Sequence, residues 1–160
     1  MKKIESFRID HDILEPGMYI SRVDGDIVTY DIRTRKPNMG DYMSNSAIHT
    51  TEHIFATYVR NSNYTDAVIY FGPMGCRTGF YLLLKDSVSH SDAIALVRDT
   101  FDFISNFEGK IPGSDKIECG NYLEHNLCLA KLEAEKMLKV LEKWSEIDLA
   151  YPTKRDKGGE

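Results

Sequence analysis

The sequence predicts an α+β fold: a single domain in which helices pack on one face of a mainly antiparallel sheet, as a two-layer sandwich. Several β-favouring runs are interspersed with three helical patterns. The 160 residues fit one domain and are enough to bury most of its apolar surface. No repeat or linker divides the chain, and its last ten residues lack apolar periodicity. We therefore expect one folded domain over residues 1–150 and a mobile tail over 151–160.

The first predicted elements form a β-hairpin. Residues 18–23 and 27–35 are β-favouring runs, and the Asp-Gly step between them is a strong signal for a tight turn. Alternation in the second run places Asp31 and Arg33 together on a polar face that we expect to be accessible. The pair is either an ordinary solvated strand face or a binding feature, and the pattern leaves both open.

Two more strands are predicted at residues 67–71 and 78–85, joined by a turn of small residues at 72–75. Such a turn lets a ligand or another backbone approach closely, and it presents Cys76 at the end of the sheet. From the residues alone, Cys76 is either an inert packing thiol or a functional one.

Three helices are predicted from apolar residues at helical spacing. Their expected spans are 44–60, 89–107 and 124–145, with a cap at Ser44, Asn45 or Ser46 for the first and at Ser89 or Ser91 for the second. A loop and a short extended segment at 117–122 precede the third helix.

The three cysteines, Cys76, Cys119 and Cys128, are few and odd in number. In a chain without an export signal, such a set favours free thiols for metal binding or catalysis over disulfide bridges. Cys128 neighbours the apolar stripe of the third helix, which predicts a packing role for that thiol.

Charge and the N-terminal residues indicate the kind of partner and the location. A formal net charge of -5 argues against nucleic acid or an anionic membrane surface as the main partner. Glu5 and Arg8 lie where a signal peptide would have its apolar core, and no uncharged run is long enough to span a bilayer. We therefore expect a cytoplasmic protein that acts on a small molecule.

His49 and His53 are the most informative pair in the chain. Because residues four apart lie one turn above each other on a helix, these two imidazoles can bind one metal ion. Glu52 lies on nearly the same side and places a carboxylate beside whatever the metal binds. The order is the inverted H-x-x-E-H of some zinc peptidases. The alternative to a metal site is that both histidines lie on a solvated helix face, and a third metal ligand elsewhere in the chain would decide between the two.

Three segments taken together resemble one family, the S-ribosylhomocysteine lyases, which make the precursor of autoinducer-2. They are residues 48–53, 72–81 and 118–122, in that order and at that spacing. Further likeness at residues 5–11 and 30–38 extends the resemblance over nearly the whole chain except the tail. The resemblance therefore implies that residues 1–150 form a lyase catalytic domain.

One position departs from the family pattern. Many relatives place an Asp shortly before the Pro-Met-Gly-Cys run, where this chain has Tyr70, Phe71 and Gly72. The sequence therefore does not predict which residue contacts the amino group of the substrate here.

The resemblance implies that His49, His53 and Cys119 bind one divalent metal ion per subunit, with the fourth position open to water or substrate. Ferrous iron is the usual metal of the family, and Zn²⁺ or Co²⁺ can take its place. A closed structural site would need a fourth protein ligand such as His125 or Cys128. We expect neither to serve, because the predicted helix that carries them turns its stripe into the core.

The family reaction cleaves S-ribosylhomocysteine to homocysteine and 4,5-dihydroxy-2,3-pentanedione without a redox cofactor. A carbonyl migrates along the ribose chain through enediolates until β-elimination expels the thiolate, and the metal stabilises the negative charge as a Lewis acid. The resemblance implies that Glu52 and Cys76 are the two proton carriers. The product serves either quorum sensing or only homocysteine recycling in the methyl cycle.

Substrate binding and assembly also follow from the resemblance. It assigns Ser6, His11 and Arg33 to the ribosyl hydroxyls and the homocysteine end, which suits their chemistry. Family active sites lie at the interface of a homodimer, so we expect the second subunit to deliver Ser6, Phe7 and His11.

Two other classes of function remain open. In an inverted-zincin-type metallopeptidase, Glu52 would activate a zinc-bound water. Such enzymes are larger and take a carboxylate as the third ligand, whereas the third candidate here is Cys119. A non-catalytic metal-binding module would require an ion closed to solvent.

Overall fold

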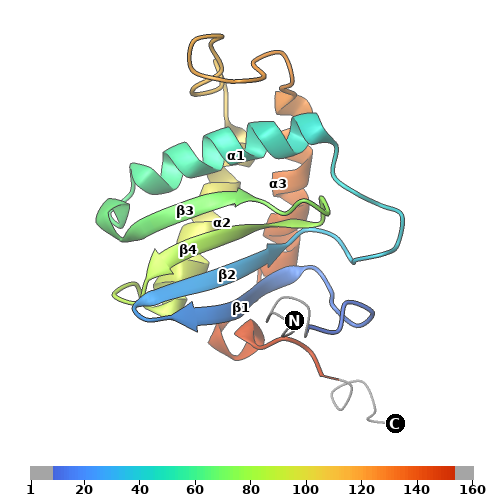
Figure 1. Cartoon of the computed structure of the whole chain (residues 1–160), viewed down its shortest axis with the longest axis vertical. Helices are drawn as coiled ribbons and strands as arrows, with labels where there is room; N and C mark the ends of the chain where they lie inside the picture. Colours follow the sequence, from blue (N-terminus) through green and yellow to red (C-terminus); the bar gives the residue numbers. More distant parts are fainter. Residues whose placement is uncertain (1–8, 154–160) are drawn as a thin grey trace, which may run out of the picture.

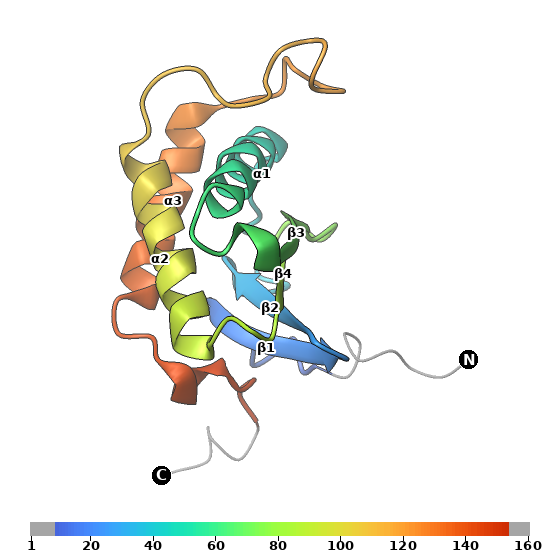
Figure 2. The same cartoon turned by 90° about the vertical axis from the view of Figure 1, so that its left-hand side faces the viewer.

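In the computed structural model, which describes residues 9–153, four strands form one antiparallel sheet in the order β1-β2-β4-β3 (Figure 1). The strands are β1 (Gly17–Asp24), β2 (Ile27–Arg33), β3 (Val68–Pro73) and β4 (Gly79–Lys85). The helices are α1 (Asn45–Arg60), α2 (His90–Asn106) and α3 (Leu127–Leu141), with 3₁₀ turns η2 (Thr65–Ala67) and η3 (Glu146–Leu149). All three helices lie on one face of the sheet (Figure 2). The predicted single α+β domain is confirmed.

An aromatic stack fixes α1 over the sheet. The ring of Phe55 on α1 stacks on Phe71 of β3 at a centroid distance of 3.8 Å, and Phe71 stacks on Phe80 of β4 at 5.1 Å. All three side chains are buried, and such aromatic pairs add stability beyond the area that they bury. The Ser44 side chain caps α1 by accepting the backbone N–H of Ala47. The core and the cap together set where the first turns of α1 lie.

The polar face of β2 is buried, which corrects the expectation that Asp31 and Arg33 are accessible. Their exposed fractions are 0% and 2%. They lie on the sheet face away from the helices. The segment that follows η3 reaches this face, and its Tyr151 covers the pair. Its ring stacks on Tyr19 of β1, and its hydroxyl donates to Asp31 Oδ2 at 2.8 Å. The first residue of the predicted tail is thus packed on the domain.

Two expectations around the third helix were wrong. Residues 117–122 form turns instead of an extended segment, because the backbone N–H groups of Glu118 and Cys119 both donate to Asp115 O. Helix α3 begins at Leu127, three residues later than predicted, because the Asn126 side chain caps it by accepting the Leu129 N–H. His125 therefore precedes the helix. The connection over residues 107–126 runs past α1 at the top of Figure 1.

The cysteines are free, as predicted, but Cys128 is exposed and does not pack in the core. Ser6, Phe7 and residues 154–160 lie outside the described residues. Between residues 9 and 153, no helix is both long and apolar enough to cross a lipid bilayer.

Candidate active site

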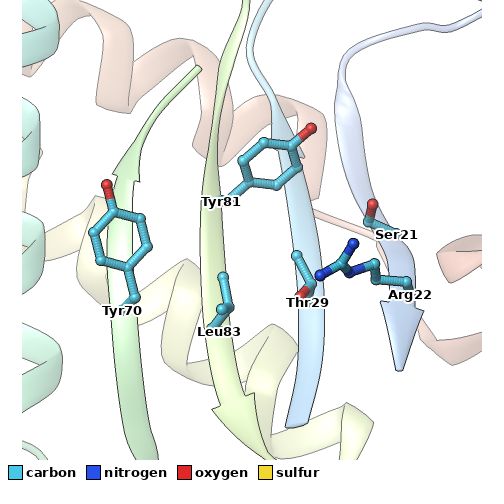
Figure 3. A pocket seen from close by; sticks show the side chains of 6 residues that line it. All are labelled: Ser21, Arg22, Thr29, Tyr70, Tyr81 and Leu83. Carbon is cyan, nitrogen blue, oxygen red and sulfur yellow. The ribbon is translucent and has the colours of Figure 1, made fainter. Parts of the chain in front are cut away.

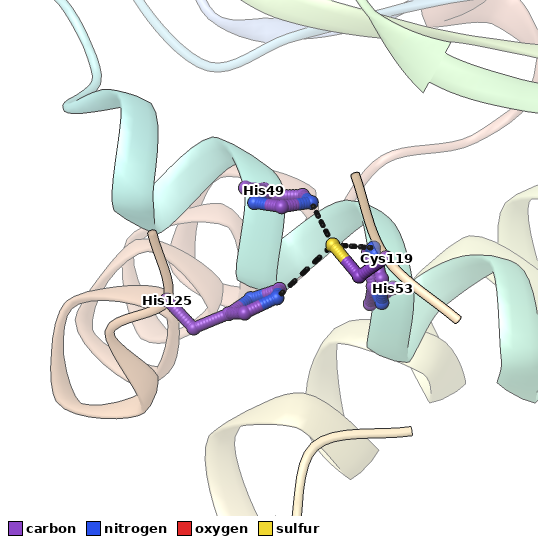
Figure 4. A group of neighbouring side chains, drawn as sticks. All are labelled: His49, His53, Cys119 and His125. Atoms are coloured by element: carbon purple, nitrogen blue, oxygen red, sulfur yellow. Dashed lines mark hydrogen bonds between the residues drawn. The ribbon is translucent and has the colours of Figure 1, made fainter. Parts of the chain in front are cut away.

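Four side chains from two distant parts of the chain, α1 and the connection before α3, form a candidate metal site: His49, His53, Cys119 and His125. Their ligand atoms all lie within 4.8 Å of one another. Figure 4 shows the imidazoles around the Cys119 sulfur, which lies 3.3 Å from His49 Nε2 and 3.9 Å from both His53 Nε2 and His125 Nε2. Ligands of one tetrahedral zinc ion have sulfur and nitrogen about 3.6 Å apart. The group can therefore hold one metal ion.

Backbone carbonyls orient the two histidines of α1. His49 Nδ1 lies 3.0 Å from Glu124 O, and His53 Nδ1 lies 2.8 Å from Pro112 O. Because a carbonyl oxygen can only accept, each Nδ1 carries a proton, and the neutral form of each ring therefore has its lone pair on Nε2. Metal-binding histidines are held in this way in many proteins. Both rings thus fit a metal on the side where the cysteine sulfur lies.

Gly113 makes room for His53. Its φ of +66° is in the left-handed region, and a Cβ atom built there would lie 3.3 Å from His53 Nδ1. A side chain at this position would be strained and would press on the imidazole. The loop over residues 107–126 therefore needs a glycine where it passes α1.

The structure brings His125 into the cluster, which corrects the expectation that this residue is directed away. The ring stacks on His49 at a centroid distance of 4.1 Å, and Nδ1 lies 3.2 Å from Thr50 Oγ1. Burial lowers the pKa of His125, and His49 and His53 add to the effect, so its imidazole favours the neutral form that binds metals. If Asn126 had been recognised as the N-cap of the third helix, His125 would have been predicted to lie in the preceding loop, where it is a candidate metal ligand.

Glu52 lies beside the cluster on α1 and is partly exposed. Its carboxylate is not one of the four grouped ligands. Among residues 9–153, the Glu52 side chain makes no hydrogen bond or ion pair. The carboxylate is therefore available to a bound molecule.

Cys76 is exposed in a pocket of about 380 Å³ that is separate from the metal cluster. The residues that line this pocket are His11, Pro37, Asn38, Tyr42, Gly75, Cys76, Arg77 and Thr78. Asn38 and Arg77 both have φ near +60°, which is strained for residues with side chains. His11, which the sequence predicts to bind substrate, lines the same pocket as Cys76.

Arg33 lies behind the wall of this pocket and contacts Cys76 through Thr78. Its guanidinium forms a two-point ion pair with Asp31, and Nη1 donates to Thr78 Oγ1 at 2.6 Å. Burial acts to lower the pKa of Arg33, but the charge and hydrogen bonds of Asp31, together with smaller effects of Cys76 and Tyr151, outweigh it and the pKa is raised. The Thr78 hydroxyl in turn lies 3.0 Å from Cys76 Sγ. The Arg33 charge is therefore fixed in place near the thiol.

The predicted site residues form two groups within one chain. None of His49, His53, Cys119 and His125 lines the Cys76 pocket, and neither does Glu52. The sheet face away from the helices carries a further hollow of about 320 Å³, lined by Ser21, Arg22, Thr29, Tyr70, Tyr81 and Leu83 (Figure 3).

Fold and site together define a small α+β protein that can hold one metal ion by imidazole and thiolate ligands, with a second, exposed thiol in a pocket of its own. A family model described as S-ribosylhomocysteinase (LuxS) matches residues 4–148. The chain belongs to this family, as its resemblance predicts, and it is an enzyme of that family.

Curated relatives cover almost the whole length. An S-ribosylhomocysteine lyase of Borreliella burgdorferi (strain ZS7) is 49% identical over 95% of this chain and 100% of its own. Those of Phocaeicola vulgatus and Clostridium acetobutylicum are 47% and 45% identical, over 96% and 95% of this chain and 99% of their own.

Proposed function

We propose that the protein is a metal-dependent carbon–sulfur lyase that cleaves S-ribosylhomocysteine to homocysteine and 4,5-dihydroxy-2,3-pentanedione. The observation that carries this proposal is the convergence of His49, His53 and Cys119, from α1 and a loop, in a chain whose relatives are named S-ribosylhomocysteine lyases. The cluster contains no carboxylate, so it does not support the metallopeptidase alternative.

The reaction needs two proton carriers, one on each side of the sugar chain, because the carbonyl migrates by proton transfers between neighbouring carbons. The carbon adjacent to the one that bears sulfur becomes acidic only after the carbonyl has moved beside it, and its deprotonation then expels the thiolate. A divalent metal, Fe²⁺ by family resemblance and Zn²⁺ or Co²⁺ as substitutes, supplies Lewis-acid stabilisation of the enediolate charge. Glu52 has a carboxylate free of hydrogen bonds within residues 9–153 and serves as one carrier. Cys76 serves as the other.

Thr78 prepares Cys76 for this role. Its hydroxyl oxygen accepts from Arg33 Nη1, which leaves the hydroxyl hydrogen free to donate to Cys76 Sγ at 3.0 Å. A hydrogen bond donated to the sulfur stabilises negative charge on it, and the nearby guanidinium adds to this effect. Arg33 thus acts mainly on the thiol. Ser6 and His11 are left to hold the substrate.

The working unit is a homodimer with active sites at the interface. Substrate carbons must reach the metal, Glu52 and Cys76 together, yet the Cys76 pocket of one chain is not lined by the metal cluster. Because His11 lines the Cys76 pocket, the subunit that delivers His11 also delivers Cys76. The uncovered sheet face in Figure 3, with Tyr70 47% exposed, provides an apolar surface for the second subunit.

The main test is anaerobic incubation of the metal-loaded protein with S-ribosylhomocysteine, followed by assay of free thiol. We expect Cys76→Ala to retain the metal and lose thiol release, and Cys119→Ala to lose the metal. Cys128→Ala is the control, because this exposed thiol lies in neither group. No thiol above background from the metal-loaded wild type would refute the lyase function.

Mixed dimers test how the site is divided between subunits. We expect Cys76→Ala and Glu52→Gln to be inactive separately. In a mixed dimer, one of the two sites would combine an intact Glu52 with an intact Cys76, so random mixing would restore about a quarter of wild-type activity. If both residues came from one subunit, mixing would restore none, and the proposed division would be wrong while the lyase function stood.

A further inference from the structure

The connection between β2 and α1, over residues 34–44, forms one wall of the Cys76 pocket. It runs at the right of Figure 1. Its residues in the lining are Pro37, Asn38 and Tyr42. Residues 38–42 are exposed, and Asn38, with a φ of 61°, has a backbone conformation that a side chain disfavours. Because strained conformations persist only where surrounding contacts hold them, this wall needs an anchor.

Backbone hydrogen bonds hold only the two ends of this connection. At its start, the N–H of Arg35 donates to Thr78 O at 3.1 Å. At its end, the N–H of Met43 donates to Arg77 O, also at 3.1 Å. In the part of the chain that the structure describes, residues 36–42 form no backbone–backbone hydrogen bond. The middle of the connection is therefore held by side chains.

The Arg35 side chain joins this middle to the helix layer. Its Nη2 donates to Glu133 Oε1 of α3 at 2.6 Å, and its Nε lies 3.1 Å from Asp41 Oδ2. One planar guanidinium thus contacts a helix on one side and the connection on the other. Lys36 also pairs with Glu15, but both side chains are partly exposed, and such pairs contribute little. Arg35 is therefore the main anchor.

The ion pair of Arg35 and Glu133 is better suited to fixing a position than to raising stability. Both side chains are buried, with exposed fractions of 7% and 9%. Well-packed apolar residues often stabilise a fold as much as a buried ion pair does, because burying two charges is costly. Glu133 Oε2 is buried and has no hydrogen-bond partner among the described residues, which adds to this cost.

We propose that Arg35 is a positioning residue for the substrate: anchored by Glu133, it holds Asp41 and with it the wall of the Cys76 pocket. The proposal rests on the proposed lyase function, in which this pocket receives the substrate. Neither residue of the buried ion pair lines the pocket or belongs to the metal cluster, so both act through the wall. Loss of the anchor should weaken substrate binding and leave the chemistry at Cys76 largely intact.

NMR relaxation tests the anchor without substrate. Arg35→Met/Glu133→Leu removes the ion pair and leaves no charge of the pair buried. Lys136→Ala is the matched control, because Lys136 Nζ contacts the same Glu133 Oε1, at 3.2 Å, from an exposed position. In the zinc-loaded protein, we expect ¹⁵N order parameters over residues 38–42 of about 0.8 in wild type and control, and below about 0.6 in the double variant. Equal values in wild type and double variant would overturn the proposal.

Steady-state thiol release from S-ribosylhomocysteine tests the positioning. We expect KM to rise about tenfold in Arg35→Met/Glu133→Leu, the effect of losing a hydrogen bond to a charged group, while kcat changes less than about twofold. Lys136→Ala should keep the wild-type KM. A merely structural role would reduce the amount of active enzyme and leave KM unchanged. Unchanged KM in the double variant, or a loss confined to kcat, would overturn the proposal.

Asp41→Ala keeps the test decisive if the double variant does not fold. The Asp41 side chain is 74% exposed, so its loss spares the core but removes the contact with Arg35. We expect KM to rise here too, and an unchanged KM would overturn the proposal. Thiol release by wild type distinguishes the failures. None from the metal-loaded protein would refute the lyase function and the positioning with it, whereas release with unchanged KM in the variants would refute the positioning alone.

Discussion

The hydroxyl oxygen of Thr78 lies 3.0 Å from the sulfur of Cys76, and it also accepts a hydrogen bond from Arg33. This contact predicts that Thr78→Val slows thiol release by about tenfold or more, because the valine cannot stabilise charge on the sulfur. Thr78→Ser keeps the hydroxyl and should keep most of the activity.

Alkylation separates this effect from turnover. Iodoacetamide should modify Cys76 more slowly in Thr78→Val than in wild type, both measured in a Cys128→Ala background that removes the other exposed thiol. Metal content should stay unchanged, because Thr78 contacts no residue of the metal cluster. Equal alkylation rates would contradict a role for Thr78 in preparing the thiol.

The buried Asp31–Arg33 pair predicts a large loss of stability when one charge is removed. Asp31→Asn leaves the Arg33 charge buried without its partner, and we expect the free energy of unfolding to fall by about 3–5 kcal/mol in urea titrations. Tyr151→Phe removes only the hydrogen bond to Asp31 and should cost about 1.5 kcal/mol. If Asp31→Asn lost no more free energy of unfolding than Tyr151→Phe, the ion pair would not be the main contribution of Asp31 to stability.

Structural features that depend on a local sequence pattern could be predicted, whereas features that depend on contacts between distant residues could not. Alternation and helical spacing located β2 and α1, and the spacing of His49 and His53 located half of the metal site. The burial of Asp31 was missed because Tyr151, which covers it, follows 120 residues later. His125 was missed because a boundary error of three residues placed a loop residue on a helix.

Oxygen should inactivate the iron-loaded enzyme. Fe²⁺ and a catalytic thiolate both oxidise in air, so thiol release should decline during aerobic storage. The zinc-loaded form, whose metal has no redox chemistry, should decline more slowly, through the thiol alone. Stable activity of the iron form in air would contradict this expectation.

Stability should decline at alkaline pH through buried tyrosines. Burial raises the pKa of Tyr30 from the ordinary 10.0 to about 12, with a smaller contribution from Glu146. Between these values the unfolded chain loses a proton that the folded chain keeps, so stability falls as pH rises from 10 to 12. In Tyr30→Phe the decline should be shallower by up to about 1.4 kcal/mol per pH unit. Urea titrations at pH 9 to 11 measure it, with Tyr122→Phe, at an exposed loop position, as the control.

Two glycines of the loop over residues 107–126 separate backbone strain from crowding of the metal site. Gly113 and Gly109 both have positive φ, but only at Gly113 would a Cβ atom meet His53 Nδ1, at 3.3 Å. We expect both Gly→Ala variants to lose about 1–2 kcal/mol of stability, because alanine is strained in this region. Only Gly113→Ala should also weaken Zn²⁺ binding, by about tenfold, because it disturbs the bond that orients His53. Chelator competition measures the affinities, and equal weakening in both variants would show that loop strain, and not contact with His53, controls metal binding.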